Sequence, residues 1–242
     1  MTPATTPAIT LMTYNIRLGV ETSLAAIARA IHAAGVPDIL ALQEIGDHWN
    51  MGERCDQTAA IARAIGHPHH VFAGALVDDH GGRYGIALTS RHAIEGITIT
   101  RLPRGTDEQR VLLAATLRAP LGPIRVFVTH LSIHAHERLE QARHLAHALE
   151  DAARQGPVLL LGDLNDRPDT PTLATIRGPL TDLFETTGHG PADTFSVKAP
   201  HRRIDYLLCG GGLVPHGPAR VVREATASDH FPLIGAVRLR WR

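Results

Sequence analysis

The sequence predicts a layered α/β sandwich in which helices cover two β-sheets. Three observations support this. Stretches with helical spacing of apolar residues occur between short apolar runs. Between residues 70 and 129 five strand-like runs follow one another without a helix, which is typical of antiparallel neighbours. The run VLLL at 158–161 is wholly apolar, so we expect both faces of that strand to be covered.

The chain of 242 residues contains no Gly/Ser-rich or Pro-rich linker and no fixed-period repeat. We therefore predict one domain over residues 9–242, preceded by a short flexible tail at residues 1–8. The first residues lack the basic segment and long apolar run of a signal peptide, and no apolar run is long enough for a transmembrane helix. These features predict a cytoplasmic, monomeric protein without a transmembrane segment.

The charged residues balance, with 24 basic and 24 acidic side chains and a formal net charge of zero. A hydrophobic content of 44% argues against a disordered chain. Non-specific binding of nucleic acid depends on a surplus of positive charge, and the chain as a whole has none. A local basic groove stays open as an alternative.

The first half of the chain predicts two strands and two helices. A strand is expected at 8–14, and a helix at 22–34 places apolar residues on one face. A second strand is expected at 38–44. A short helix follows at 56–65, with Asp56 in the position of an N-cap.

The remainder is rich in strands and contains one long helix. The helix is predicted at 136–154, where leucines and alanines form one apolar stripe. It leads into the apolar strand that begins at 158. The other predicted strands are 70–77, 85–90, 94–101, 110–118, 123–129, 204–209, 219–224 and 232–239.

Polar side chains gather just beyond the ends of the apolar strands, where a rigid scaffold can present them to a ligand. These residues are Asn15, Glu44, His130, Asp163, Asn165, Asp205, Asp229 and His230. Any one of them alone is more typical of a turn or helix cap. Together, their carboxylate and amide oxygens suit Mg²⁺ or Mn²⁺, and a histidine beside a carboxylate can act as a base toward water. Zinc is the alternative metal, although no close H-x-x-x-H pair occurs among them.

Seven blocks in order carry a resemblance to a known family: TYNIR, LQE, YGIALTSR, THLS, GDLND, RRIDYLL and SDHFP. The chain resembles the endonuclease/exonuclease/phosphatase superfamily, which has the deoxyribonuclease-I-like fold, over about residues 9–239. The resemblance implies a four-layer α/β/β/α sandwich of two mixed, largely antiparallel sheets flanked by helices. It also implies a hydrolase that acts on ester bonds with Mg²⁺, or with Mn²⁺, as cofactor.

The resemblance implies a metal role for three of these residues. Glu44 would be the principal metal ligand, with Asn15 beside it in the same coordination sphere. Asp229 would help to bind the metal or brace the site.

The resemblance assigns the remaining residues to catalysis. Asp163 and Asn165 would hold the attacking water or a second metal and contact the phosphate. His230, oriented by Asp205, would act as general base or as a charged phosphate stabiliser, and His130 would hydrogen-bond a phosphoryl oxygen. Whether Asp163 or His230 takes the proton from water is open.

Three further side chains are candidates for contacting the substrate phosphate: Tyr84, Arg110 and Arg203. In secreted deoxyribonuclease I an acid pairs with the histidine that corresponds to His130. No such acid is evident near Tyr84, because Gly82 and Arg83 precede it. The sequence therefore leaves the orientation of His130 undetermined.

The substrate has to be inferred from how this chain departs from the branches of the superfamily. The stretch DTFSVKAPHRRID lacks the tryptophans typical of apurinic-site nucleases. THLS, RRIDYLL and SDHFP look closest to the compact bacterial phosphoesterases and the sphingomyelinase or deadenylase side. We therefore expect a phosphodiesterase that acts on a small molecule or lipid head group.

Two alternatives remain. A nuclease acting on DNA or RNA is favoured if six arginines form one basic rim: Arg83, Arg91, Arg101, Arg104, Arg202 and Arg203. A catalytically silent module that binds a phosphorylated ligand or a protein is the alternative of another class. Such a module would be expected to have lost some of the catalytic residues, and this chain has them all.

Overall fold

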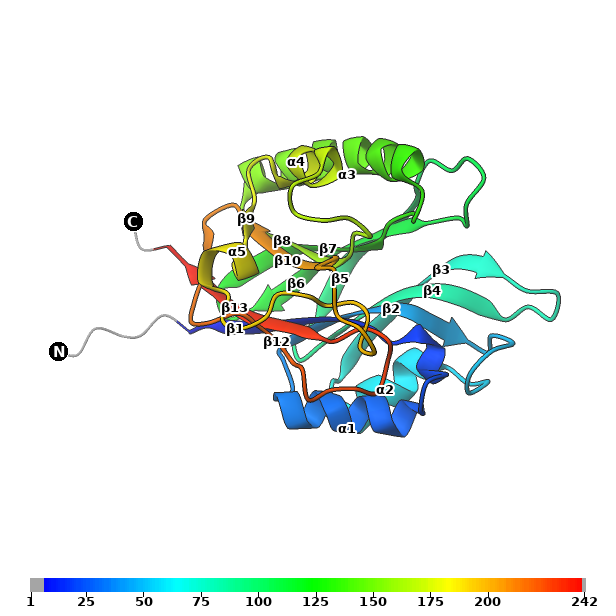
Figure 1. Ribbon diagram of the computed structural model, residues 1–242. Coiled ribbons are helices and arrows are strands. Elements are labelled where there is room, and N and C mark those ends of the chain that lie inside the picture. The colour runs from blue at the N-terminus through cyan, green and yellow to red at the C-terminus, as the bar shows by residue number, and fades with distance from the viewer. Residues whose placement is uncertain (1–6, 241–242) are drawn as a thin grey trace.

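A computed structural model describes residues 7–240, and it stacks two β-sheets face to face between helices (Figure 1). Helices α3 (Ala135–Gln155) and α4 (Pro171–Arg177) cover one sheet, and α1 (Leu24–Ala34) and α2 (Gln57–Ile65) cover the other. The four-layer α/β/β/α sandwich is confirmed. Most of the predicted N-terminal tail, residues 1–6, lies outside the described residues.

The first sheet has seven strands and is mixed, with β1 and β2 parallel and its other pairs antiparallel. Its order is β11 (Leu213–Pro215), β13 (Leu233–Leu239), β1 (Ile9–Asn15), β2 (Ile39–Asp47), β4 (Arg83–Ser90) and β3 (His69–Val77), and β12 (Arg220–Val221) pairs with β13.

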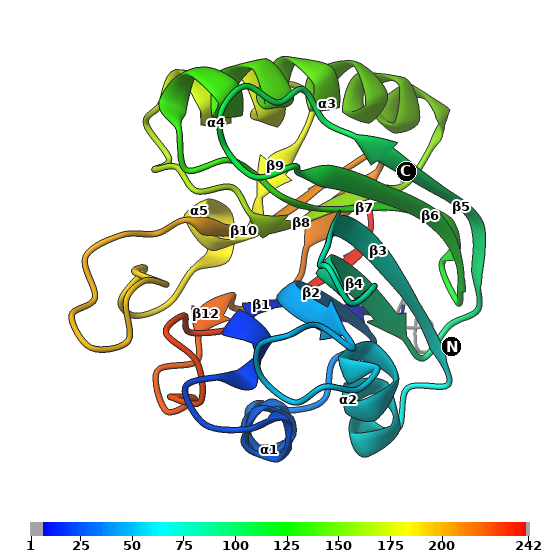
Figure 2. The same cartoon turned by 90° about the vertical axis from the view of Figure 1, so that its right-hand side faces the viewer.

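The second sheet has six strands, of which β7 and β8 are parallel and the remaining pairs antiparallel. Its order is β5 (Ile94–Arg101), β6 (Val111–Ala119), β7 (Gly122–His130), β8 (Val158–Asp163), β10 (Asp205–Gly210) and β9 (Thr181–Asp182). Viewed from the side, the two sheets are twisted against each other (Figure 2).

The helix boundaries follow local capping chemistry. The side chain of Asp56 accepts a hydrogen bond from the Ala59 backbone N–H at 2.9 Å, so the predicted N-cap of α2 is confirmed. In α4, Thr170 caps the helix and Pro171 occupies its first turn.

Five short elements were not predicted, and one strand is shorter than expected. The helices α4 and α5 (Leu183–Thr187) and the 3-10 turn η1 (Arg17–Gly19) are too short to show helical periodicity, and the strands β9 and β11 have only two and three residues. The strand expected at 219–224 is reduced to β12.

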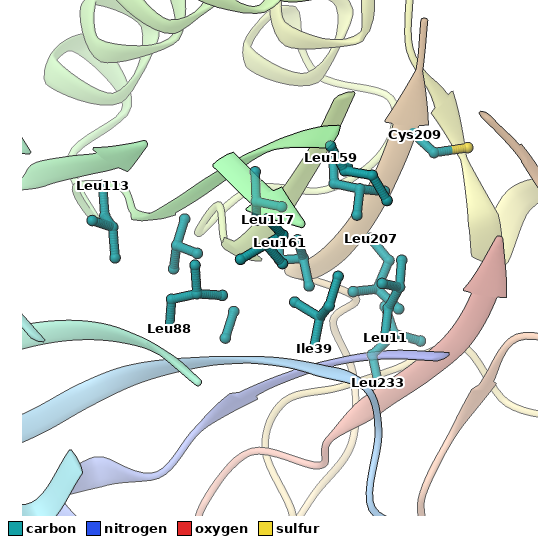
Figure 3. Close-up of a cluster of buried hydrophobic side chains, with 14 of the residues drawn as sticks. Leu11, Ile39, Leu88, Leu113, Leu117, Leu159, Leu161, Leu207, Cys209 and Leu233 are labelled. Carbon is teal, nitrogen blue, oxygen red and sulfur yellow. The ribbon is translucent and has the colours of Figure 1, made fainter. Parts of the chain in front are cut away.

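The inner faces of the two sheets form one apolar core (Figure 3). Leu11 and Ile39 face this core from the first sheet, and Leu159, Leu161 and Leu207 face it from the second. All residues of β8 are buried, as expected for a strand covered on both faces. The core therefore fixes the position of one sheet relative to the other. This in turn fixes the distances between side chains at the strand ends, where residues from both sheets meet.

None of the helices within residues 7–240 is both long and apolar enough to cross a membrane.

We expect Leu11→Ala to lower the free energy of unfolding by about 2–5 kcal/mol, because it leaves a cavity between the two sheets. Ile99→Ala is the matched control, since Ile99 is 46% exposed on the edge strand β5. Chemical denaturation measures both. Equal losses in the two variants would contradict a core located between the sheets.

Candidate functional site

A cavity of about 470 Å³ receives side chains from both sheets. The polar residues predicted from the sequence make up much of its wall. Those lining it are Glu44, Tyr84, Arg110, His130, Asp163, Asn165, Asp229 and His230. A larger cavity of about 580 Å³, between α3 and strands of the second sheet, contains none of the predicted catalytic residues.

Strand register brings three of the polar residues into one row. His130 ends β7 opposite Asp163, which ends β8, and Asp163 pairs in turn with Asp205 at the start of β10. Gly162, just before Asp163, allows the close approach of β7, because a Cβ there would lie 2.2 Å from the Thr129 carbonyl oxygen. The glycine of the GDLND block is therefore required by the packing of the sheet.

Glu44 lies at an irregularity of β2. The pairing of β2 with β4 shifts register between Gln43 and Ile45, and Glu44 has a φ of 51°. A bulge redirects a side chain, and a non-glycine residue at positive φ is a strained conformation that is common at functional sites. The bulge turns the carboxylate of Glu44 into the cavity instead of leaving it in the pleat of the sheet.

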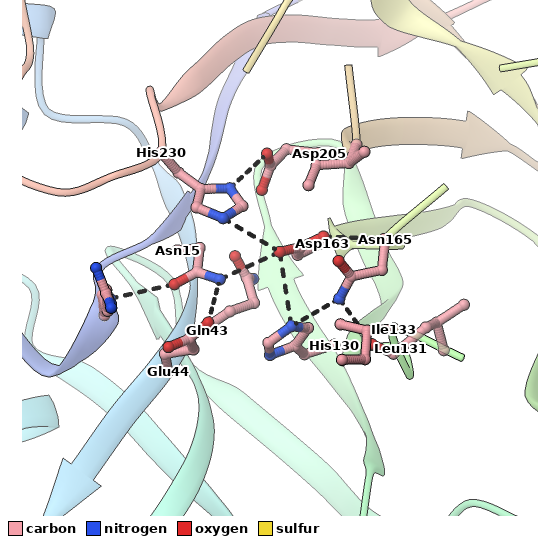
Figure 4. Close-up of polar contacts among 12 residues, drawn as sticks. Asn15, Gln43, Glu44, His130, Leu131, Ile133, Asp163, Asn165, Asp205 and His230 are labelled. Atoms are coloured by element: carbon pink, nitrogen blue, oxygen red, sulfur yellow. Dashed lines mark hydrogen bonds and ion pairs between the residues drawn. The ribbon is translucent and has the colours of Figure 1, made fainter. Parts of the chain in front are cut away.

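Asn15 joins the carboxylates of the two sheets. Its Nδ2 donates to Glu44 Oε1 at 2.9 Å and to Asp163 Oδ2 at 3.1 Å (Figure 4). Its Oδ1 accepts a hydrogen bond from the Arg17 backbone N–H at 3.1 Å. Asn15 therefore presents nitrogen to the two carboxylates, and it would bind a metal through oxygen only after its amide rotated.

Asp163 lies between two histidines (Figure 4). Its Oδ2 is 3.6 Å from His130 Nε2 and 3.7 Å from His230 Nε2. The other nitrogen of His230, Nδ1, lies 3.0 Å from Asp205 Oδ2. The contact between His230 and Asp205 thus fixes the ring so that its second nitrogen faces Asp163.

Burial and neighbouring charge shift the proton affinities of this group. Burial, followed by the charge of Asp205, raises the pKa of Asp163 to about 7. Burial by itself would lower the pKa of His230, but the charges of Asp205 and Asp163 outweigh it and raise the pKa to about 10. At neutral pH these two carboxylates therefore favour the cationic form of His230.

The side chain that contacts His130 Nδ1 is a cationic arginine, Arg110, and not an acid. Arg110 Nη1 lies 3.0 Å from His130 Nδ1. Because a guanidinium only donates, we assign the proton of the neutral ring to Nε2, which lies 3.1 Å from the side-chain amide of Asn165 and 3.6 Å from Asp163 Oδ2. Burial and the charge of Arg110 keep the pKa of His130 well below its usual range. His130 is therefore a neutral N–H donor, and Arg110 sets its orientation.

The donor set fits a hard divalent cation. Burial raises the pKa of Glu44 against the hydrogen bond from Asn15, so a nearby cation would relieve an unfavourable buried charge. Within residues 7–240, Asp205 Oδ1 is buried without a hydrogen-bond partner. Carboxylate oxygens of Asp163 and Asp205 also lie within 4.8 Å of each other and of a nitrogen of His230, which as a cation would not itself bind a metal. Oxygen predominates among these donors, which suits Mg²⁺ or Mn²⁺.

Asp229 faces the cavity on the side of the first sheet. Its Oδ2 lies 3.4 Å from Arg17 Nη1, and its Oδ1 lies 3.3 Å from the hydroxyl of Ser228. The Ser228 hydroxyl donates to the Asn15 carbonyl oxygen at 2.9 Å, which ties this loop to β1. Asp229 is therefore held beside the group formed by Asn15 and Glu44.

The structure does not bring Arg203 to the cavity. Its Nη1 lies 2.8 Å from Asp182 Oδ2, and its guanidinium stacks over the rings of Phe184 and Tyr206. Arg202 lines the cavity instead, with its guanidinium over the ring of Phe195. Adjacent arginines in an irregular segment look equivalent in sequence, and only the fold determines which one faces inward.

Tyr84 lines the cavity and packs against Trp49, with ring centroids 5.6 Å apart. Burial and then the charge of Glu44 raise the pKa of the Tyr84 hydroxyl above its usual value. Tyr84 is therefore a neutral hydroxyl beside the candidate metal ligand.

Several residues of the cavity wall, and several buried polar residues of the helix beside it, were not predicted from the sequence. Glu108, Ile133, Phe195 and Ile204 also line the cavity. The first turns of α3 bury polar side chains where only an apolar stripe was expected: Glu137, Arg138 and Gln141. The one signal in the sequence was their position on the buried face of that helix.

Arg138, in α3, contacts two of the segments around the cavity. Its Nη1 donates to the carbonyl oxygens of Ser132 and Ile133, and its Nε donates to Asp166 Oδ2 at 2.9 Å. The segments that follow His130 and Asp163 are thereby held together.

The model of the Endonuclease/Exonuclease/phosphatase family matches residues 12–230. The uncharacterized protein YbhP of Escherichia coli K12 is 31% identical over 165 residues, which cover 65% of this chain. The match spans 64% of the length of YbhP.

Solved structures of the same family share the fold. A family protein from Beutenbergia cavernae superimposes with a TM-score of 0.81 at 26% identity, covering 96% of this chain and 72% of that one. The mannosyl-6-phosphatase Bt3783 of Bacteroides thetaiotaomicron gives a TM-score of 0.76 at 20% identity, covering 96% of this chain and 100% of that one. The chain belongs to the endonuclease/exonuclease/phosphatase family, whose members are hydrolases that act on phosphoester bonds.

Proposed function

We propose that the protein is a divalent-metal-dependent phosphoesterase, and more specifically a phosphodiesterase, that hydrolyses a P–O bond by in-line attack of water. The observation that carries this proposal is the position of Asp163, which lies between His130 and His230 at the junction of the two sheets. A buried carboxylate beside a neutral N–H donor and a cationic imidazole provides both a base and two stabilisers for a phosphoryl group.

The metal site we propose is built on Glu44 and Asp229, with Asn15 beside them. When bound, Mg²⁺ or Mn²⁺ would supply positive charge that neutralises the phosphoryl oxygens. Asn15 links this site to Asp163 by one hydrogen bond to each carboxylate. The proposed metal site at Glu44 and the proposed site of the attacking water at Asp163 would thereby be held at a fixed separation.

We assign the base to Asp163 rather than to His230. Asp163 lies between the two histidines, and burial raises its pKa toward the neutral range in which a general base works best. His230 is already protonated at neutral pH, so it is suited to stabilise the charge that develops on the phosphoryl oxygens. Asn165 and His130 would donate to the same oxygens.

We propose a compact phosphoester as substrate, a small molecule or a lipid head group. A cavity of about 470 Å³ suits a small ligand. The mannosyl-6-phosphatase of Bacteroides thetaiotaomicron and ANGEL2, a 2′,3′-cyclic phosphatase, have the same fold.

A nuclease is the competing proposal, and the arginines argue against it. Three of the six that could form a basic rim lie beside acidic groups: Arg83 contacts Asp47, Arg91 is 3.8 Å from Asp38, and Arg203 pairs with Asp182. Only Arg202 of the six lines the cavity as the structure describes it. A silent binding module is less well supported, because the catalytic set is complete.

We expect the purified protein to hydrolyse a small chromogenic phosphodiester with Mg²⁺ or Mn²⁺ and to lose this activity in EDTA. A panel with plasmid DNA, single-stranded RNA and phospholipid vesicles then ranks the substrate classes. Full activity after removal of all divalent ions would overturn the metal requirement. Absence of turnover on every diester and monoester would overturn the proposed function.

Glu44→Gln and His230→Ala should each lower kcat/KM by roughly 100-fold or more, because each removes a principal catalytic group. The controls are Glu95→Gln and His136→Ala, at exposed positions outside the cavity. Circular dichroism establishes that all four variants fold. Near wild-type rates in the folded Glu44 and His230 variants would show that the site is elsewhere.

A further inference from the structure

The loop between β5 and β6 places an acidic side chain at the cavity that the proposed chemistry does not use. Glu108 lines the cavity, and its side chain is 51% exposed. The other acidic residues of the wall, Glu44, Asp163 and Asp229, belong to the proposed metal and water sites. Glu108 is instead close to Arg110, with its Oε2 3.5 Å from Arg110 Nη2.

Buried contacts fix the loop just before Glu108. Glu137 Oε1 accepts hydrogen bonds from the backbone N–H groups of Thr106, at 2.5 Å, and Asp107, at 3.1 Å. The side chain of Asp107 accepts a hydrogen bond from the Ser132 hydroxyl at 2.5 Å. The backbone that leads into Glu108 is therefore tied to the start of α3 and to the segment after His130.

The residue after Glu108 is fixed as well. Gln109 Nε2 donates to the carbonyl oxygens of Leu102 and Arg110, at 2.8 and 2.7 Å. The residues on either side of Glu108 are therefore held by hydrogen bonds, and these bonds place the Glu108 side chain at the cavity.

The positive charge near Glu108 is divided among several partners. Arg110 contacts His130 through Nη1, and its Nη2 lies 3.8 Å from Asp107 and 3.5 Å from Glu108. One guanidinium therefore faces two carboxylates, Asp107 and Glu108, so its positive charge is shared between them. A carboxylate in such a place accepts hydrogen bonds from hydroxyl groups and repels a further anion.

We propose that Glu108 is a specificity-determining residue, which selects phosphoesters that carry a single phosphate and present hydroxyl groups to it. Substrates that place a second phosphate near Glu108 are disfavoured, because the carboxylate and the phosphate repel each other. This inference rests on the proposed function and names the substrate class of the same site. Two unit charges about 7 Å apart in a partly hydrated site repel enough to change affinity roughly 3- to 10-fold.

The test compares two dinucleotides that differ by one phosphate, adenylyl-adenosine and the same molecule with a 5′-phosphate. We expect the wild-type protein to prefer the singly phosphorylated compound, mainly through KM. Glu108→Gln should reduce that preference roughly 3- to 10-fold, because the repelling charge is gone. Glu95→Gln is the matched control, since its side chain is 50% exposed and pairs with Arg118 outside the cavity.

A preference that is the same in Glu108→Gln and in the wild-type protein would overturn the inference while leaving the proposed function intact. Calorimetry provides a readout without turnover, using inorganic phosphate and pyrophosphate as ligands in EDTA, so that no Mg²⁺ neutralises the second phosphate. The ratio of their affinities should shift toward pyrophosphate in Glu108→Gln. If neither dinucleotide is cleaved, this affinity ratio still tests the inference separately from the proposed function, and an unchanged ratio would refute the role of Glu108.

Discussion

The buried carboxylate of Asp163 is the constraint on which the site depends. A charged group removed from water is costly unless donors and opposite charges compensate it. Asp163 meets this requirement through the Asn15 amide and the Asn165 backbone N–H, at 3.1 and 2.9 Å, with His230 beside it. These partners come from both sheets, so the same contacts that make burial of the carboxylate tolerable also assemble the proposed catalytic group.

The two histidines beside Asp163 each have a second charged partner. Asp205 keeps His230 protonated and oriented, while burial and then the charge of Arg110 keep His130 neutral. Two histidines that flank one carboxylate thereby acquire different protonation states from their second partners. A bulge in β2 turns Glu44 into the cavity, where burial raises its pKa despite the hydrogen bond from Asn15. A cation bound there would complete the balance of charge.

The sequence predicted the elements with long or distinctive patterns. The apolar strand β8, the long helix α3 and the capping residue Asp56 all follow from local spacing and chemistry, and seven sequence blocks indicated the family. The contact between Arg110 and His130 could not be predicted, because it joins the residue before β6 to the end of β7 through side-chain geometry. The inward position of Arg202 instead of Arg203 and the polar contacts at the start of α3 likewise depend on tertiary packing.

Anomalous diffraction from a crystal grown with Mn²⁺ decides whether Glu44, Asp229 and the neighbouring polar groups bind a hard divalent cation. We expect a strong anomalous peak in the cavity within coordination distance of a Glu44 carboxylate oxygen, and its loss in Glu44→Gln. A crystal with Mn²⁺ at saturating concentration and no peak in this cavity, or a peak that persists unchanged in Glu44→Gln, would contradict it.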